Sequence, residues 1–100
     1  MLHYTASKGA IVAMTRSLSR DVGSDGITVN AIAPGLTITE GIRENKGYSE
    51  EMLAGVIASR AIPRTECAED LVGTCMFLAS DAANFVTGQI VVADGGATFH

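Results

Sequence analysis

The sequence contains no tryptophan, only two cysteines and few charged side chains, and these shortages narrow what the protein can be. Charged residues make up 18% of its 100 residues, and acids outnumber bases 11 to 7, for a net charge of −4. No basic cluster supplies the electropositive surface that nucleic-acid binding needs. No apolar run approaches the ~20 residues of a membrane-spanning helix, and no signal peptide opens the chain. We expect a cytoplasmic protein with neither a nucleic-acid nor a membrane partner.

The scarcity of cysteine and histidine argues against a disulfide and against a metal site. Cys67 and Cys75 lie eight positions apart in an expected helix, where the rise per residue separates them by about 12 Å. That distance is too long for a disulfide, so we interpret both as reduced, buried small hydrophobes. The two histidines lie at opposite ends of the chain, and no Cys or His spacing fits a metal site.

The remaining composition is that of one small α/β domain. Hydrophobic residues make up 47% of the chain and are mostly Ala, Ile, Val and Leu. An apolar stripe at helical spacing (Ala6, Ala10, Met14, Leu18 and Val22) predicts a helix over residues 5–22, and Gly23 supplies its end. The later patterns predict a buried strand over 27–33, a helix from Ser49 to about Arg60, a helix over 65–80 and a strand over 89–93.

The segment after the first predicted strand is a candidate ligand-binding loop. Pro34-Gly35 ends that strand abruptly, and ligands of open α/β sheets bind outside the carboxyl ends of the strands. Residues 40–48 are polar and interrupted by glycine, and a short helix follows them. They form either a lid over a cleft or a solvated surface excursion, and the sequence leaves both open.

Tyr4 and Lys8 are the candidate catalytic pair. On a helix, side chains four positions apart share one face, with Cβ atoms about 5–6 Å apart. A tyrosine hydroxyl normally titrates near 10, and an ammonium one turn away favours the phenolate form. Such a pair suits a general acid/base acting on a carbonyl or carbinol oxygen. A tyrosine packed on a lysine stem is the simpler alternative, and the pair alone does not decide between them.

A series of segments in a fixed order makes the chain resemble the C-terminal portion of the short-chain dehydrogenases/reductases. The resemblance spans all 100 residues and rests on Tyr4–Gly9, Val29–Gly35, Glu69–Val72, Phe77–Ser80, Val86–Gln89 and Asp94–Gly96. It implies the C-terminal part of a Rossmann-like, doubly wound parallel α/β sheet, with the order helix-strand-helix-helix-strand. The implied function is hydride transfer between NAD or NADP and a small carbonyl compound or alcohol. Within the family, the chain most resembles the 3-oxoacyl-carrier-protein reductases and related secondary alcohol dehydrogenases.

The resemblance also assigns residue roles. It implies that Tyr4 exchanges a proton with the substrate oxygen, while Lys8 assists the tyrosine and holds the nicotinamide ribose hydroxyls. It implies that Pro34 and Gly35 shape the loop beside the nicotinamide. The last two implied cofactor contacts are the Thr37 backbone at the carboxamide and the Thr39 hydroxyl at the carboxamide or diphosphate.

Other expectations concern the substrate and the partner. Residues 40–60 resemble the family's variable substrate loop, so His3, Glu40 and Met52 are candidate pocket neighbours. Asn30 is expected to fix backbone near the cleft rather than to touch the substrate. By the same resemblance the full-length form is a homo-oligomer, a dimer or tetramer, that packs helix 5–22 against a partner subunit.

The chain departs from the family because no glycine-rich GxGxxG pattern occurs in it. In the family, that loop and the catalytic serine precede the tyrosine. We therefore expect residues 1–100 to be a single partial domain, roughly the last two-fifths of a typical member. Two strands and three helices bury too little surface for comfortable stability, and the strand over 27–33 would keep an open edge. The alternative is a non-catalytic interaction module that acts through helix 5–22 and the terminal strand.

The missing glycine-rich pattern leads to the first testable prediction. We expect the purified 100-residue chain to show no turnover of secondary alcohols with NAD or NADP, because no motif for the diphosphate is present. The formation of reduced nicotinamide, followed by its absorbance, measures this. Dinucleotide-dependent oxidation of any secondary alcohol by the 100-residue chain would contradict the prediction.

Overall fold

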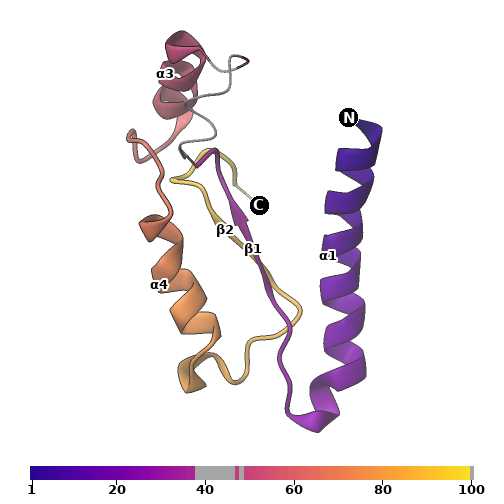
Figure 1. Ribbon diagram of the computed structural model, residues 1–100. Coiled ribbons are helices and arrows are strands. Elements are labelled where there is room, and N and C mark those ends of the chain that lie inside the picture. The colour runs from indigo at the N-terminus through magenta and orange to yellow at the C-terminus, as the bar shows by residue number, and fades with distance from the viewer. Residues whose placement is uncertain (38–46, 48, 100) are drawn as a thin grey trace. The chain divides into compact units, whose positions relative to one another are not determined.

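The structure, a computed structural model, describes residues 1–37, 47 and 49–99, and in these residues it contains helices and two short strands (Figure 1). The elements are α1 (Leu2–Val22), β1 (Ala31–Pro34), α3 (Glu50–Ser59), α4 (Glu69–Leu78) and β2 (Ile90–Ala93). Short 3-10 turns occupy Gly23–Asp25 and Asp81–Ala83. The predicted order of helices and strands is confirmed. No helix in the described ranges has the length and apolarity that crossing a bilayer requires.

The two strands form a parallel pair. The amide of Ala31 donates to the carbonyl of Gln89 at 2.9 Å, and that of Gly35 donates to Ala93 at 3.4 Å. Both partners advance in the same direction along the chain, as in a parallel ladder. The strand residues are half-buried, apart from the exposed Pro34, rather than buried on both faces. In the described sheet β1 pairs only with β2, so its other edge is open.

The strand predicted over residues 27–33 is observed only at Ala31–Pro34. Just before it, one backbone bond remains, from the Gly88 amide to the Val29 carbonyl at 2.7 Å, and side chains make the other bonds. The Val29 amide donates to the Thr87 hydroxyl, and the Asn30 side-chain amide donates to the Val86 carbonyl. Such side-chain bonds offer the backbone an alternative to regular strand pairing.

The predicted helix boundaries also shift. α1 begins at Leu2 rather than at residue 5, and α4 spans Glu69–Leu78 rather than 65–80. The residues before α4 are engaged elsewhere, because Glu66 forms an isolated parallel bridge with Thr37. The predicted cap of α3 is confirmed, since the Ser49 hydroxyl accepts from the Met52 amide at 3.1 Å.

Two compact units make up the chain. The first contains Met1–Ile32 and Thr74–Val91, and the second contains Ala33–Gly73 and Val92–His100. Helix α1 therefore belongs to the first unit and α3 to the second, while α4 and both strands cross the division.

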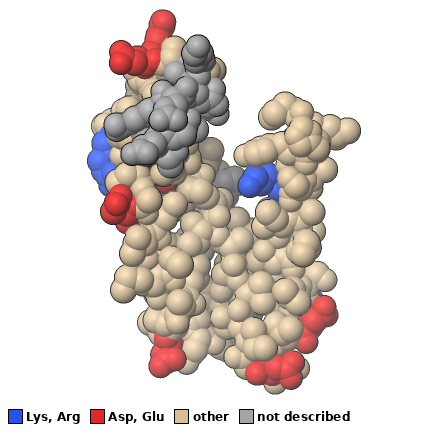
Figure 2. Space-filling model, viewed as in Figure 1, with Lys and Arg blue, Asp and Glu red and all other residues tan. Residues whose placement is uncertain are grey.

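In the first unit, the buried face of α1 is not the predicted apolar stripe. Thr15 and Ser19 are buried, whereas Met14 and Leu18 are 63% and 45% exposed. The two hydroxyls donate to helix carbonyls, so they carry no unsatisfied donor into the interior. A Cβ on Gly88 would lie 2.8 Å from Ser19 Oγ, so small residues let the turn before β2 approach the helix here. Uncharged side chains cover most of the α1 surface seen in Figure 2.

The end of α1 differs from the prediction that Gly23 stops it. Gly23 keeps right-handed helical angles and continues into a 3-10 turn. The chain reverses at Gly26, which has a φ of 75° and donates from its amide to the Gly23 carbonyl. Left-handed backbone of this kind favours glycine, so Gly26 is the residue that terminates the helix.

The expected burial of α4 is only partly observed. Leu71 and Leu78 are half-buried, but Val72, Met76 and Cys75 are exposed. Both cysteines are free, as predicted, although the prediction that Cys75 is buried was wrong. Among the described residues no element covers that side of α4 closely enough to bury it.

The described part of the chain holds no cluster of three or more side chains that could bind a metal ion.

In the second unit, Asp94 organises the turn after β2. Its buried carboxylate accepts from the backbone amides of Gly96, Ala97 and Thr98 and from the Thr98 hydroxyl, at 2.7–3.2 Å. The Thr98 hydroxyl bond, followed by the amide bonds, lowers the pKa of the Asp94 carboxyl. A carboxylate with a depressed pKa stabilises the fold above its unfolded pKa, and this contribution is lost as the pH falls.

Asp94→Asn tests this carboxylate. We expect it to lower the protection of the 96–98 amides by roughly tenfold at neutral pH, because the amide nitrogen of asparagine cannot accept. In the parent the same protection should begin to decline below about pH 4, the ordinary range of an aspartate pKa, and fall further as the pH approaches the lowered pKa of the folded carboxyl. Amide hydrogen exchange, corrected for intrinsic rates, measures both. The control is Asp81→Asn at an exposed turn, and equal protection in all three proteins would refute the role of Asp94.

Candidate active site

Helix α1 carries the predicted catalytic pair in the first unit. Lys8 Nζ lies 5.4 Å from the centroid of the Tyr4 ring, within the roughly 6 Å over which a cation is attracted to a ring face. Both side chains are exposed, with 53% of Tyr4 accessible. The spacing of four residues therefore brings a phenol and an ammonium together where a ligand can reach both.

Small residues leave the surroundings of this pair open. A Cβ on Gly9 would meet no atom within 4 Å. The Ser7 hydroxyl donates to the Tyr4 carbonyl at 2.8 Å, so it is satisfied within the helix. His3 is exposed in the same turn, and its place as a pocket neighbour stays a prediction.

The second predicted part of the site is the segment after β1, which lies in the second unit. Gly35 is held in close packing: a Cβ there would lie 2.6 Å from Glu66 Oε2 and 3.2 Å from Arg60 Nη2. The Thr37 hydroxyl donates to the Gly35 carbonyl at 3.3 Å, and Thr37 pairs with Glu66 in the isolated bridge. Any side chain at Gly35 would displace this ion pair or the loop itself.

Some predicted site residues lie outside the described part of the chain. These are Thr39 and Glu40, together with the predicted lid segment except for Gly47. Their roles stay predictions.

Asn30 fixes backbone, as expected. Its side-chain nitrogen donates to the Val86 carbonyl at 2.9 Å, and its side-chain oxygen accepts from the Gln89 amide at 3.1 Å. One amide side chain thus ties the entry to β1 to the segment that leads into β2.

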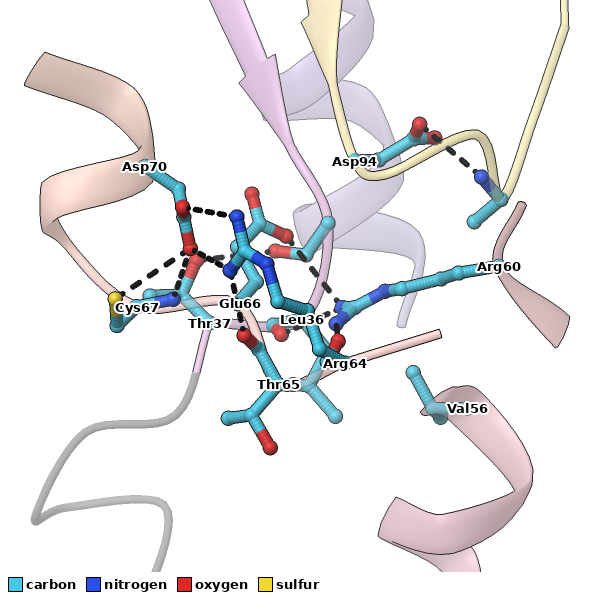
Figure 3. Close-up of polar contacts among 12 residues, drawn as sticks. Leu36, Thr37, Val56, Arg60, Arg64, Thr65, Glu66, Cys67, Asp70 and Asp94 are labelled. Atoms are coloured by element: carbon cyan, nitrogen blue, oxygen red, sulfur yellow. Dashed lines mark hydrogen bonds and ion pairs between the residues drawn. The ribbon is translucent and has the colours of Figure 1, made fainter. Parts of the chain in front are cut away.

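A buried arginine that the sequence analysis did not single out holds the loop over 34–37. Arg60 is only 6% exposed. Its Nη2 donates to the Leu36 carbonyl at 2.8 Å, and its Nη1 donates to the Arg64 carbonyl at 2.9 Å. Nη2 also lies 3.4 Å from Glu66 Oε2, as an ion pair between nearly inaccessible side chains. Figure 3 shows the guanidinium reaching from the end of α3 towards these acceptors.

A second ion pair lies beside the first in the same unit. The Arg64 guanidinium forms two hydrogen bonds to the Asp70 carboxylate, at 2.8 and 2.6 Å. Asp70 Oδ2 also accepts from the Cys67 amide at 2.9 Å (Figure 3). The Arg64 bond, followed by the Cys67 amide bond, holds the pKa of the Asp70 carboxyl well below its usual range. Because 59% of the Arg64 side chain is accessible, solvent screens this pair more than the buried one.

The surroundings of Cys67 suppress its reactivity. Hydrogen bonds to the Glu69 and Asp70 side chains, the first being the larger cause, raise the pKa of the Cys67 thiol. The thiolate is the nucleophilic form of cysteine. Cys67 is therefore no candidate nucleophile.

An apolar cavity of about 370 Å³ lies between α3 and the segment after β1. Its volume falls in the range of small-molecule sites. Met52, a predicted pocket neighbour, lines it together with Leu36, Leu53, Gly55, Val56 and Ser59. Met52 itself is 53% exposed.

A comparison with protein-family models finds a match over nearly the whole chain. The model described as enoyl-(acyl carrier protein) reductase matches residues 1–98. Among curated relatives, the 3alpha-hydroxysteroid dehydrogenase of Mediterraneibacter gnavus is 42% identical over 94 residues, which is 94% of this chain and 36% of that protein. The chain therefore spans little more than a third of this relative's length.

Solved structures give the same fold. The 4-hydroxyisoleucine dehydrogenase mutant complexed with NADH and succinate matches with a TM-score of 0.84 and 32% identity, over 95% of this chain and 39% of that one. The blue fluorescent protein from a metagenomic library, in complex with NADPH, matches with a TM-score of 0.81 and 35% identity, over 96% and 37%. The predicted α/β, Rossmann-like fold class is confirmed.

The two cysteines give a direct test of the geometry around Asp70. We expect iodoacetamide to alkylate exposed Cys75 roughly tenfold faster than Cys67 at mildly alkaline pH, because hydrogen bonds hold Cys67 as the thiol. Pulse labelling followed by peptide mass spectrometry gives both rates in one sample. In denaturant the two rates should converge, which is the control. Equal rates under native conditions would show that the Cys67–Asp70 contact is absent.

Proposed function

The chain belongs to the short-chain dehydrogenase/reductase family, and on that premise we propose that it carries the proton-transfer part of an NAD- or NADP-dependent oxidoreductase. The substrate is a small carbonyl compound or secondary alcohol, with Tyr4 as its acid/base. The observation that carries the proposal is the Lys8 ammonium 5.4 Å from the Tyr4 ring, on an exposed stretch of α1. The NADH and NADPH in the two matched structures support the choice of cofactor.

The exposed donors on α1 fit the nucleoside end of such a cofactor. An ammonium and a phenol can both donate to ribose hydroxyls, and the phenol can also donate to a substrate oxygen. The bound dinucleotide supplies or accepts the hydride. In the reducing direction the Tyr4 hydroxyl gives its proton to the oxygen that gains negative charge. The positive charge of Lys8 then favours the phenolate that remains.

The segment after β1 is proposed to contact the nicotinamide. Its tight packing at Gly35 and the rigid ring of Pro34 suit a backbone that must present fixed polar groups to a ligand. The Thr37 backbone meets the carboxamide in this proposal, and the Thr39 hydroxyl meets the carboxamide or the diphosphate.

The substrate part of the proposal rests on the variable segment over 40–60. The cavity beside Met52 is lined mostly by apolar side chains, so it suits an apolar group attached to the reacting carbonyl. His3 and Glu40 are further proposed neighbours of the substrate.

The remaining parts of the proposal concern assembly and location. Exposed apolar side chains on α1, such as Met14 and Leu18, favour packing of this helix in a homo-oligomer of the full-length protein. The same surface would serve the alternative function, a non-catalytic interaction module. Residues 1–100 are proposed to act as one partial domain of a cytoplasmic enzyme.

Tyr4→Phe separates the enzyme from the interaction module. The test uses a fusion that places the amino-terminal part of the Mediterraneibacter gnavus relative before Met1 (the joined protein). We expect Tyr4→Phe to lower turnover of a 3alpha-hydroxysteroid roughly a hundredfold or more, because general acid–base catalysis contributes about 10²–10⁴-fold. Dinucleotide binding, followed by fluorescence titration, should be retained.

The matched control removes a hydroxyl one turn further along the same helix. Ser7→Ala loses a hydroxyl whose bond in the described structure lies within α1, so turnover should stay within about twofold of the parent. Undiminished turnover in Tyr4→Phe would overturn the proposed role of the phenol.

A further inference from the structure

Arg60 lies where a charged side chain is costly. It follows Ser59, the last residue of α3, and only 6% of its surface is exposed. Among the described residues its Nε has no hydrogen-bond partner, and its contact with Glu66 is a single 3.4 Å approach rather than a two-bond fork. A buried ion pair with an unsatisfied donor commonly stabilises a fold no more than apolar residues of the same size would. Stability is therefore a poor explanation for this arrangement.

Arg60 and its partner Glu66 both contact the segment over 34–37. One guanidinium nitrogen donates to Leu36, the middle of the segment over 34–37, and the other donates to Arg64. Its partner Glu66 approaches the same segment twice. The Glu66 carboxylate packs against the Gly35 backbone, and the Glu66 main chain pairs with Thr37. Figure 3 shows Leu36, Thr37 and Glu66 around the end of the Arg60 side chain.

The segment over 34–37 has few other restraints. Beyond β1, its backbone bonds within the described part of the chain are the long 3.4 Å bond from Gly35 to Ala93 and the isolated bridge at Thr37. A loop that must hold a ligand to within about 0.5 Å needs support from neighbouring side chains whose own positions are fixed. Arg60 and Glu66 are the buried charged residues that supply this support.

We propose that Arg60 and Glu66 are positioning residues that fix the backbone over 34–37 for binding of the nicotinamide dinucleotide. The inference rests on the proposed function, because it takes this segment to be a cofactor contact. Neither residue touches the substrate or takes part in proton transfer. Their effect passes through the Leu36 carbonyl and the Gly35 backbone.

The key variant is the double replacement Arg60→Met with Glu66→Met, tested in the joined protein. It removes both buried charges and keeps similar apolar volume, so the thermal midpoint should stay within a few degrees of the parent or rise. The KM for the dinucleotide should nevertheless rise about tenfold or more, because the segment loses its anchor. The KM for the steroid and the value of kcat at saturating dinucleotide should change much less.

A conservative variant and a neighbouring pair provide the controls. Arg60→Lys keeps one donor and the charge, so it should restore part of the dinucleotide affinity. Arg64→Met with Asp70→Asn removes the adjacent ion pair, whose described side-chain hydrogen bonds do not reach residues 34–37. This control should lower the thermal midpoint and leave the dinucleotide KM unchanged.

The outcomes separate this inference from the proposed function. A parent joined protein that binds no dinucleotide overturns both. A parent that binds it, beside an Arg60→Met/Glu66→Met variant with an unchanged dinucleotide KM, overturns only the positioning role. The positioning role is also overturned if the Arg60→Met/Glu66→Met variant and the Arg64/Asp70 control both lose thermal stability and dinucleotide affinity together, because such a loss is purely structural.

Discussion

The second unit depends on how one buried guanidinium satisfies its N–H groups. Removing an arginine from water requires acceptors nearby, and Arg60 finds them in the Leu36 and Arg64 carbonyls and in Glu66. Each acceptor lies in a segment without regular helix or strand structure. The guanidinium therefore joins the end of α3, the loop after β1 and the stretch before α4. Replacing it changes all three together.

Elsewhere in the described structure, too, side chains that hydrogen-bond to the backbone hold segments together in place of an apolar core. Among the described residues Ala83 is the only buried hydrophobic residue. Asn30 bridges the approaches to both strands, and Asp94 gathers three amides and a hydroxyl. Strands of four residues supply few ladder bonds of their own, so these side chains decide where the strands begin and end. The chain's span of about a third of its relative agrees with this small apolar interior.

The features that sequence patterns predicted correctly are ones that depend on local geometry. Helical spacing alone placed Tyr4 beside Lys8, and the cap at Ser49 followed from residue type. The buried face of α1 was missed because it depends on close approach by Gly88, which lies far along the chain. Arg60 was missed for the same reason: its acceptor at Leu36 is 24 positions away. No periodicity marks a charge that becomes buried only when distant segments fold around it, although an arginine just past an apolar helix was a faint signal.

This difference between local and distant determinants also separates the two parts of the proposed chemistry. The phenol and the ammonium are held by a regular helix of 21 residues, so their spacing needs nothing from the rest of the chain. The loop over 34–37 has no such internal order, and its backbone takes its position from Arg60 and Glu66. In the proposed function, proton transfer would therefore depend on local sequence, whereas cofactor placement would depend on tertiary contacts. Substitutions far from Tyr4 would then weaken cofactor binding while the proposed acid/base pair keeps its geometry.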